Sequence, residues 1–407
     1  MNKLIIKGVK LILGILFLPF WWLELLIPRN KQIILFGAWS GNKYSDNSKA
    51  LFEYILKNEP KLKVYWITKD KKIYQKLSRE KKPVLMVYSL KDWIITLQAS
   101  VVINTCANDF NNFALHGVKQ ICLWHGMPLK KIEFDTKYGI KAQGKDGKIS
   151  SKITGKIKKI VYPYTLYNKM PNVTVTSSEF FIPFLSSAFL LDKRKIWLTG
   201  LPRTDWFYKE KTESIIYNLR KKFSDTRIIL YMPTFRFSLY GMEVYDPFHD
   251  KSFNLDKFIE FLSKENIVFM YKAHFFDQAF NHSLPTDRFI LINDGDYDEL
   301  YVLISNIDIL ITDYSSVYFD FLCLNKPAIL TPFDYDFYIK EARDHYFDYN
   351  LLPSIKAYNW DELMNIIAEK KYYSLPKQEA DKFCKYNDGH ASERILQKTL
   401  ELLDKSA

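Results

Sequence analysis

The chain has 407 residues, which is too long for one ordinary hydrophobic core and suits two domains of about 150–200 residues each. Hydrophobic residues make up 48% and aromatic residues 16% of the sequence, which are fractions typical of a folded protein and exclude a disordered chain. A formal charge of +12 predicts an anionic partner such as lipid headgroups, a phosphorylated substrate or nucleic acid.

The cysteines are widely spaced and form neither a Cys-x-x-Cys pair nor a cluster with histidine. We interpret them as reduced, mostly buried thiols of a cytosolic protein, because a disulfide framework or a zinc site requires closer spacing. They are Cys106, Cys122, Cys323 and Cys384.

Residues 1–30 have membrane character and form a predicted membrane-associating helix. Residues 11–27 are apolar except for Glu24, are interrupted by Pro19, and carry Trp21 and Trp22 behind three lysines at helical spacing. Seventeen residues are short of the roughly 20 that a full span needs. Tryptophans beside lysines favour a helix that lies at an anionic cytoplasmic surface, with a single span or a buried core helix as alternatives.

Residues 31–210 alternate strand and helix patterns, which implies βαβ units and a parallel sheet. The predicted strands are 33–37, 64–67, 84–87, 101–104, 120–124, 173–176 and 195–199, and the predicted helices are 46–57 and 90–98. Between residues 139 and 160 the alternation stops, and seven lysines accompany a single aspartate. This segment predicts a solvated loop, or a basic flap near an acidic acceptor or the bilayer.

A charged stretch at residues 209–225 predicts a linker and a helix, and a second alternating series follows it. Its predicted strands are 228–231, 267–271, 289–292, 307–311 and 328–330, and its predicted helices are 255–264, 297–304, 316–324, 360–369 and 391–403. We therefore predict two Rossmann-like, doubly wound domains, residues 31–210 and 211–407, that face each other across a cleft.

Residues 307–321, IDILITDYSSVYFDF, combine a buried strand, a tight turn and a helix start. The strand passes through Thr312 and Asp313 into the pair Ser315 and Ser316. In a parallel sheet such a turn lies at the carboxyl edge, where ligands bind and where N–H groups at a helix start favour phosphate. Taken alone, the stretch also fits a simpler interpretation, in which Ser315 caps its helix and Asp313 closes the turn.

Four further polar motifs follow strands in the same way. They are WHGMPLKK at 124–131, GLPRTD at 200–205, YMPTFR at 231–236 and YKAH at 271–274. Five such motifs, in a fold that binds ligands at its strand ends, predict one composite site lined by both domains.

These motifs contain histidines and arginines that suit phosphate chemistry. His125 can take a proton from an attacking hydroxyl, and Gly126 after it lets a substrate approach the backbone closely. His274 can donate a hydrogen bond to a phosphate oxygen, and Arg203 and Arg236 have bidentate geometry for phosphate. For each residue alone, a structural role at a turn or on the surface remains the alternative.

In order along the chain, these motifs resemble the CDP-glycerol glycerophosphotransferase family, which contains the teichoic acid primases and polymerases. Residues 37–56 and 388–394 are similar to the ends of that family's pattern, so the resemblance covers nearly the whole chain. Two positions depart from it. Met127 stands where the family usually has threonine, and Phe275 stands where it often has proline after the histidine.

The resemblance implies a GT-B architecture, with an acceptor-binding first domain and a nucleotide-binding second domain. It also implies a reaction in which CDP-glycerol donates glycerol phosphate to an acceptor hydroxyl and CMP leaves. Phosphoryl transfer depends mainly on positioning and charge neutralisation. The resemblance thus implies His125 and His274 as catalytic residues, and Gly126, Arg203, Thr234, Arg236, Thr312, Asp313, Ser315 and Ser316 as substrate-binding residues.

No resident cofactor is predicted, because no dense carboxylate cluster indicates a required metal, although a dependence on Mg²⁺ stays open. The spacing of Asp294, Asp296 and Asp298 favours a capping run. The implied partners are CDP-glycerol, an undecaprenyl-diphosphate-linked disaccharide or nascent polymer, and an anionic membrane surface at the cytoplasmic face of the cell membrane. Nucleic acid is not predicted, because the lysines gather in one loop without a base-reading motif.

Three alternatives remain at this stage. The donor could carry ribitol phosphate or another alditol phosphate, or the fold could transfer a sugar from a UDP- or GDP-sugar, since a fold does not fix its chemistry. The third alternative is a membrane-bound scaffold that binds polyanions and has no enzymatic activity.

Overall fold

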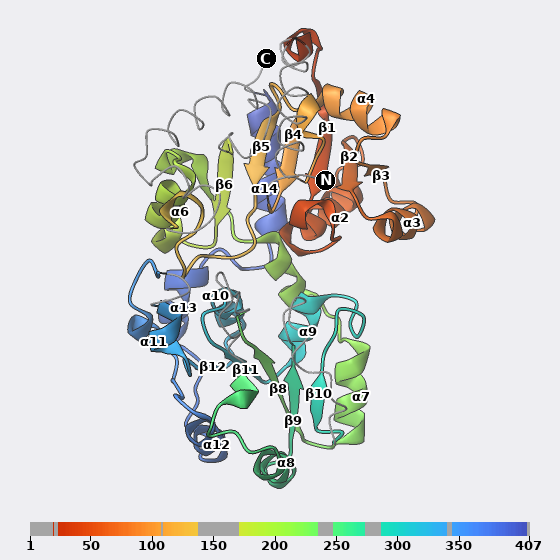
Figure 1. The fold of residues 1–407 in the computed structure, drawn as a ribbon. Helices are drawn as coiled ribbons and strands as arrows, with labels where there is room; N and C mark the ends of the chain where they lie inside the picture. The colour runs from red at the N-terminus through yellow and green to blue at the C-terminus, as the bar shows by residue number, and fades with distance from the viewer. Residues whose placement is uncertain are drawn as a thin grey trace, which may run out of the picture.

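The computed structural model describes Pro19 and residues 23–106, 109–136, 171–234, 247–272, 286–339 and 344–404. In this part of the chain the strands form two sheets, and every strand pair within them is parallel. Figure 1 shows one sheet above the other, with helices around both. The predicted α/β class with parallel sheets is confirmed.

The first sheet has the strand order β3-β2-β1-β4-β5-β6-β7. Its strands are β1 (Asn30–Gly37), β2 (Lys63–Thr68), β3 (Val84–Met86), β4 (Ala99–Asn104), β5 (Lys119–Cys122), β6 (Val173–Thr176) and β7 (Ile196–Leu198). The helices along this part of the chain are α2 (Asp46–Asn58), α3 (Lys71–Arg79), α4 (Leu90–Gln98) and α6 (Ile182–Phe189). Consecutive residues of β1 are buried, because the central strands of a parallel sheet are covered on both faces.

The second sheet has the order β10-β9-β8-β11-β12. Its strands are β8 (Arg227–Met232), β9 (Ile267–Tyr271), β10 (Phe289–Leu291), β11 (Ile309–Thr312) and β12 (Ala328–Leu330). The helices around it are α7 (Ser214–Lys222), α8 (Leu255–Lys264), α9 (Leu300–Asn306), α10 (Val317–Phe321), α11 (Tyr335–Phe337), α12 (Trp360–Ala368) and α13 (Lys377–Cys384). Both sheets therefore reverse their strand order beside their first strand, and ligands of doubly wound folds bind at such reversal points.

Three elements of the second series differ by more than one residue from their predicted bounds. Helix α9 begins at Leu300, where the Glu299 side chain caps it by accepting the Tyr301 N–H, and Tyr297 lies before the helix. Strand β11 begins later than predicted, at Ile309. The predicted helix 316–324 is the five-residue α10 followed by a 3-10 turn, Leu322–Leu324.

A shared hydrophobic cluster joins the two halves of the chain. It contains Ile34 of the first sheet and Leu310 of the second sheet, both fully buried. Aromatic side chains continue it: the ring centroids of Phe181 and Phe319 lie 5.1 Å apart, and those of Phe319 and Phe383 lie 5.4 Å apart. The halves are thus in direct apolar contact in this conformation.

After the second sheet the chain returns to the first half through its last helix, α14 (Ala391–Asp404). The carboxylate of Asp205 accepts the Ala391 and Ser392 N–H groups at 2.9 and 2.8 Å, which caps this helix. The Arg394 guanidinium donates to the carbonyl oxygen of Thr199 from two nitrogens, at 2.9 and 2.8 Å. Residues of α14 therefore pack with the first half, although they follow the second sheet in sequence.

The described part of the predicted N-terminal helix is Pro19 and residues 23–30, which include the 3-10 turn Glu24–Leu26. Glu24 is fully buried and accepts the His116 N–H at 2.9 Å, while Arg29 donates to the carbonyl oxygens of Thr96 and Leu97. Among the described residues, no helix is long and apolar enough to cross a membrane. The rest of the predicted helix and the lysine-rich segment 139–160 lie outside the described residues.

Candidate active site

Two predicted turns from different sheets meet in the structure. Gly126 lies in the turn after β5, and Ser316 lies in the turn after β11. Gly126 is buried with φ +129°, and a Cβ atom at this position would overlap the Ser316 side chain and the Arg203 guanidinium. A glycine is therefore required here both by its backbone conformation and by the close approach of the two turns.

His125 lies beside this contact, half-buried between aromatic rings. The ring centroid of Trp124 lies 4.1 Å from that of His125, and the Trp39 centroid lies 5.3 Å from it. The His125 Nδ1 atom lies 3.4 Å from the carbonyl oxygen of Thr105 and 3.8 Å from the Cys106 sulfur. In the tautomer with a proton on Nδ1, this proton faces the Thr105 carbonyl oxygen and Nε2 carries the lone pair that a general base needs.

Two buried polar residues that the sequence analysis missed hold the His125 turn. Asn47 of α2 donates to the carbonyl of Trp124 at 2.9 Å and accepts the Arg203 N–H at 3.1 Å. Asp109 accepts the Gly41 N–H at 3.1 Å and also binds the N–H of Cys106. Asp109 thereby joins the segment after β1, which carries Trp39, to the segment after β4, which contacts His125.

Burial raises the pKa of Asp109 to about 7, although several backbone N–H groups oppose this shift. The folded state therefore binds the Asp109 proton more tightly than the unfolded state does. As the pH rises from about 4 to about 7, the free energy of unfolding of the wild type falls, because the folded protein must then bury a charged carboxylate. We expect Asp109→Asn to gain stability relative to the wild type over this window, by up to about 4 kcal/mol. Urea unfolding at pH 5 and pH 8 measures the difference.

The exposed Asp287, which pairs with Lys222, supplies the control. Asp287→Asn should show no comparable pH-dependent gain. A gain of Asp109→Asn that is equal at both pH values would show that its carboxyl titrates normally.

The residues after β8 and β11 form a second set of predicted site residues that lie together. Asp313 is buried, and its carboxylate accepts the Thr234 N–H at 2.7 Å. The Thr312 hydroxyl donates to the carbonyl of Met232 at 2.7 Å. Ser315 Oγ accepts the N–H of Val317, the first residue of α10, at 3.4 Å. Thr312 and Asp313 thus join the ends of β8 and β11, while Ser315 and Ser316 are half-buried and Ser316 lies against Gly126 of the first half.

Arg203, a predicted phosphate ligand, pairs with carboxylates of the protein in this structure. Its side chain is buried, and its guanidinium donates to Asp46 at 2.9 Å and to Asp320 at 2.5 Å. It also donates to the carbonyl of His125 at 3.1 Å and lies 5.0 Å from the ring of Tyr301. In this conformation Arg203 is an internal link between the two halves, because carboxylates of the protein occupy the geometry that a diphosphate would need.

His274, Arg236 and the departure Phe275 lie outside the described residues. The other departure, Met127, is fully buried beneath the His125 turn, where its sulfur lies 3.3 Å from the Thr176 hydroxyl. Met127 therefore takes part in the packing under the turn.

The acidic run after β10 is used in ion pairs. Asp294 contacts Lys43 at 3.0 Å and Lys272 at 2.8 Å, and Asp298 contacts Lys211 at 3.1 Å. The pKa of Asp294 is lowered, because these ammonium groups outweigh its burial. Among the described residues, no group of three or more His, Cys, Asp or Glu side chains could hold a metal ion.

The motifs fit a known family along almost the whole chain. A family model described as CDP-glycerol:poly(glycerophosphate) glycerophosphotransferase matches residues 20–401. The teichoic acid glycerol-phosphate transferase of Staphylococcus aureus is 29% identical over 90% of this chain and 92% of that protein. The teichoic acid poly(glycerol phosphate) polymerase of Bacillus subtilis is 26% identical over 97% of this chain, which spans about half, 51%, of that protein.

A solved structure of the wall teichoic acid polymerase TagF with CDPG has the same fold. It superposes with a TM-score of 0.70 at 21% identity, over 93% of this chain and 90% of that chain. The order of the motifs, the two parallel sheets and the extent of the family match agree with one another. The chain belongs to the CDP-glycerol:poly(glycerophosphate) glycerophosphotransferase family, as its motifs predict.

Proposed function

We propose that this protein transfers glycerol phosphate from CDP-glycerol to a hydroxyl of a membrane lipid-linked acceptor and releases CMP, as a primase-like enzyme of teichoic acid or a related cell-surface polymer. The observation that supports this most directly is the contact of the His125 turn with the Ser316 turn. In this proposal a base from the first half acts on a donor that the strand-end turns of the second half bind. The two halves are the domains of a GT-B arrangement, with a cleft between them.

In the proposed reaction His125 Nε2 removes the proton from the acceptor hydroxyl. The hydroxyl oxygen attacks the phosphorus that carries glycerol, a new P–O bond forms, and the bond to the CMP oxygen breaks. Negative charge develops on the oxygen atoms of the transferred phosphate and of the departing CMP. The protein must therefore position the reactants and supply hydrogen-bond donors, and it needs little covalent chemistry. The Ser315 and Ser316 turn, Thr234 and the predicted phosphate ligands His274 and Arg236 would serve the donor.

The acceptor and the location follow from charge and from the N-terminal segment. The formal charge of +12 suits a diphosphate-linked acceptor at the cytoplasmic face of an anionic membrane. The apolar, tryptophan-containing residues 11–27 would hold the protein there as a peripheral or monotopic enzyme.

The test is a reaction of the purified chain with CDP-glycerol and a lipid-disaccharide analogue. Mass analysis should find product heavier by one glycerol phosphate unit, with CMP released in equal amount. Release of UDP or GDP from a nucleotide sugar would instead indicate sugar transfer. No turnover of any nucleotide donor would indicate the binding scaffold.

Ribitol phosphate is the second candidate cargo. The teichoic acid poly(ribitol-phosphate) polymerase of Bacillus spizizenii is 32% identical over 58% of this chain and 38% of that protein. Competition between CDP-glycerol and CDP-ribitol in the same reaction separates the two, since the preferred donor has the higher kcat/KM.

A further inference from the structure

A basic cavity lies at the edge of the first sheet opposite to the proposed active site. Its volume is about 400 Å³, and its lining residues are Lys119, Asn172, Val173, Arg194, Lys195, Trp197, Lys398, Glu401 and Leu402. Lys119 is the first residue of β5, while Asn172 and Lys195 directly precede β6 and β7. The cavity therefore lies at the amino ends of these three strands, and the last part of α14 forms its remaining wall.

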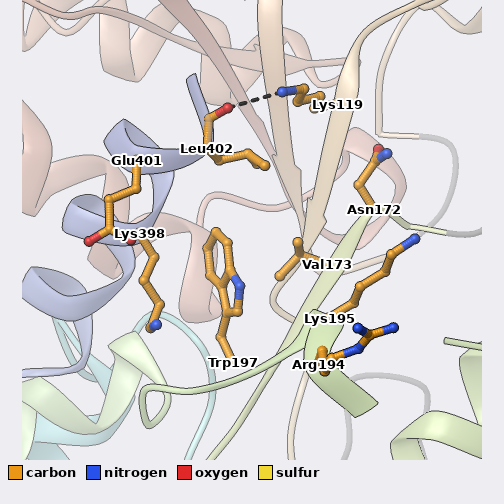
Figure 2. Close-up of a pocket in the computed structure, with 9 residues that line it drawn as sticks. All are labelled: Lys119, Asn172, Val173, Arg194, Lys195, Trp197, Lys398, Glu401 and Leu402. Atoms are coloured by element: carbon orange, nitrogen blue, oxygen red, sulfur yellow. Dashed lines mark hydrogen bonds between the residues drawn. The ribbon is translucent and has the colours of Figure 1, made fainter. Parts of the chain in front are cut away.

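The charges that line the cavity favour an anion. Four cationic side chains are present with one carboxylate, that of Glu401. Figure 2 shows Trp197 between the two sides, with Lys398 and Glu401 of α14 on one side and Arg194 and Lys195 on the other. The Lys398 ammonium lies 5.9 Å from the ring of Trp197.

Two of these cations are already bound to oxygen atoms of the protein. Lys119 donates to the carbonyl of Leu402 at 3.0 Å, which ties β5 to α14, and Arg194 pairs with Asp192 at 2.9 Å. Lys195 and Lys398, on opposite sides of Trp197, are therefore the side chains that we assign to the anion.

The same edge carries the described end of the N-terminal segment. Glu24 accepts the N–H of His116, which lies shortly before Lys119 in the chain. Leu23 and Leu26 on this segment are 56% and 78% exposed. Figure 1 shows this segment and the end of α14 together at the end of the molecule farthest from the second sheet. Apolar side chains, a tryptophan and cations thus gather at one edge, a combination typical of membrane interfaces.

We propose that the cavity formed by Lys195, Trp197 and Lys398 binds the phosphate of an anionic phospholipid headgroup and orients the protein on the bilayer. Trp197 would pack against the glycerol and upper acyl region while the two ammonium groups hold the phosphate. The reacting strand ends would then stand about one strand length, roughly 13 Å for the four residues of β6, from this lipid contact. This inference rests on the proposed function in one respect only: the proposed function supplies the membrane-linked acceptor that this orientation would bring towards the strand ends.

The test is sedimentation of the full chain with vesicles of phosphatidylglycerol and phosphatidylcholine, compared with pure phosphatidylcholine. A lysine near an anionic membrane surface strengthens the binding of a protein to that surface, and two such lysines together raise the partition coefficient onto anionic vesicles about thirtyfold. We expect Lys195→Gln/Lys398→Gln to bind the anionic vesicles about thirtyfold less well and the neutral vesicles as the wild type does. Its melting temperature and its turnover of a soluble acceptor analogue should stay unchanged.

The matched control removes the same charge from the opposite end of the molecule. Lys251→Gln/Lys264→Gln changes two exposed lysines near α8 and should leave vesicle binding almost unaltered. Equal losses in both double variants would overturn the proposal in favour of bulk charge. Wild-type binding by the cavity variant would overturn it directly.

Soluble poly(glycerol phosphate) distinguishes the other source of phosphate. If the cavity variant loses binding of this polymer and keeps its binding of anionic vesicles, the ligand is the polymer and the lipid assignment is wrong. Vesicle binding is measured without CDP-glycerol, so a failure of the proposed transferase activity would leave this result interpretable.

Discussion

His125→Ala is expected to slow glycerol phosphate transfer by about 10² to 10⁴-fold while CDP-glycerol binding stays close to that of the wild type. The loss is expected in kcat, because in the proposed reaction the imidazole removes the acceptor proton and belongs to the first half, whereas the donor is assigned to the second. CMP release measures the rate, and equilibrium titration with CDP-glycerol measures the binding. The acidic limb of the rate profile, which reports protonation of this base, should also disappear in the variant.

His390→Ala is a suitable control, because His390 is exposed and pairs with Glu393 on α14. It should retain wild-type turnover. Near-normal turnover in His125→Ala would remove His125 from the role of base, and a parallel loss of donor binding would make it a substrate ligand instead.

Arg203→Met is expected to lower the free energy of unfolding by about 3–5 kcal/mol. The change leaves Asp320, which is fully buried, without its cation, and an uncompensated charge in the interior is costly. Urea unfolding at neutral pH measures the loss. Adding Asp320→Asn to Arg203→Met should recover part of it, because the buried charge is then removed.

The exposed Arg194, which pairs with Asp192, provides the comparison. Arg194→Ala should leave the midpoint of urea unfolding almost unchanged, because an ion pair in full contact with water contributes little to stability. If Arg203→Met keeps its stability and instead loses affinity for CDP-glycerol, Arg203 binds the donor phosphate as the motif suggests, and the two halves must rearrange to release it.

The sheets could be predicted because buried parallel strands are continuous apolar runs. Strand β9 matches its prediction, residues 267–271, and α8 matches residues 255–264, where Asn254 supplies the cap. Helix α3 was missed because its sequence is mostly polar. The available signal was Asp70, whose side chain accepts the N–H groups of Lys72 and Ile73 at the helix start.

The meeting of the strand-end turns could be predicted from the order of strands, but their polar partners could not. Arg203 binds Asp46 and Asp320, which lie 157 and 117 positions away in the chain. A motif shows that an arginine follows a strand and does not show whether a carboxylate or a ligand will meet it. Asp320, a charged residue inside the apolar run VYFDF, was the visible signal of such a buried partner.

The return of α14 to the first half has a practical consequence for dissecting this protein. Cutting the chain near residue 210 would not yield two independent fragments, because the amino-terminal piece would lack the helix that Asp205 caps. A stable amino-terminal fragment would need residues 391–404 fused back onto it, and limited proteolysis at the junction should leave the two pieces associated.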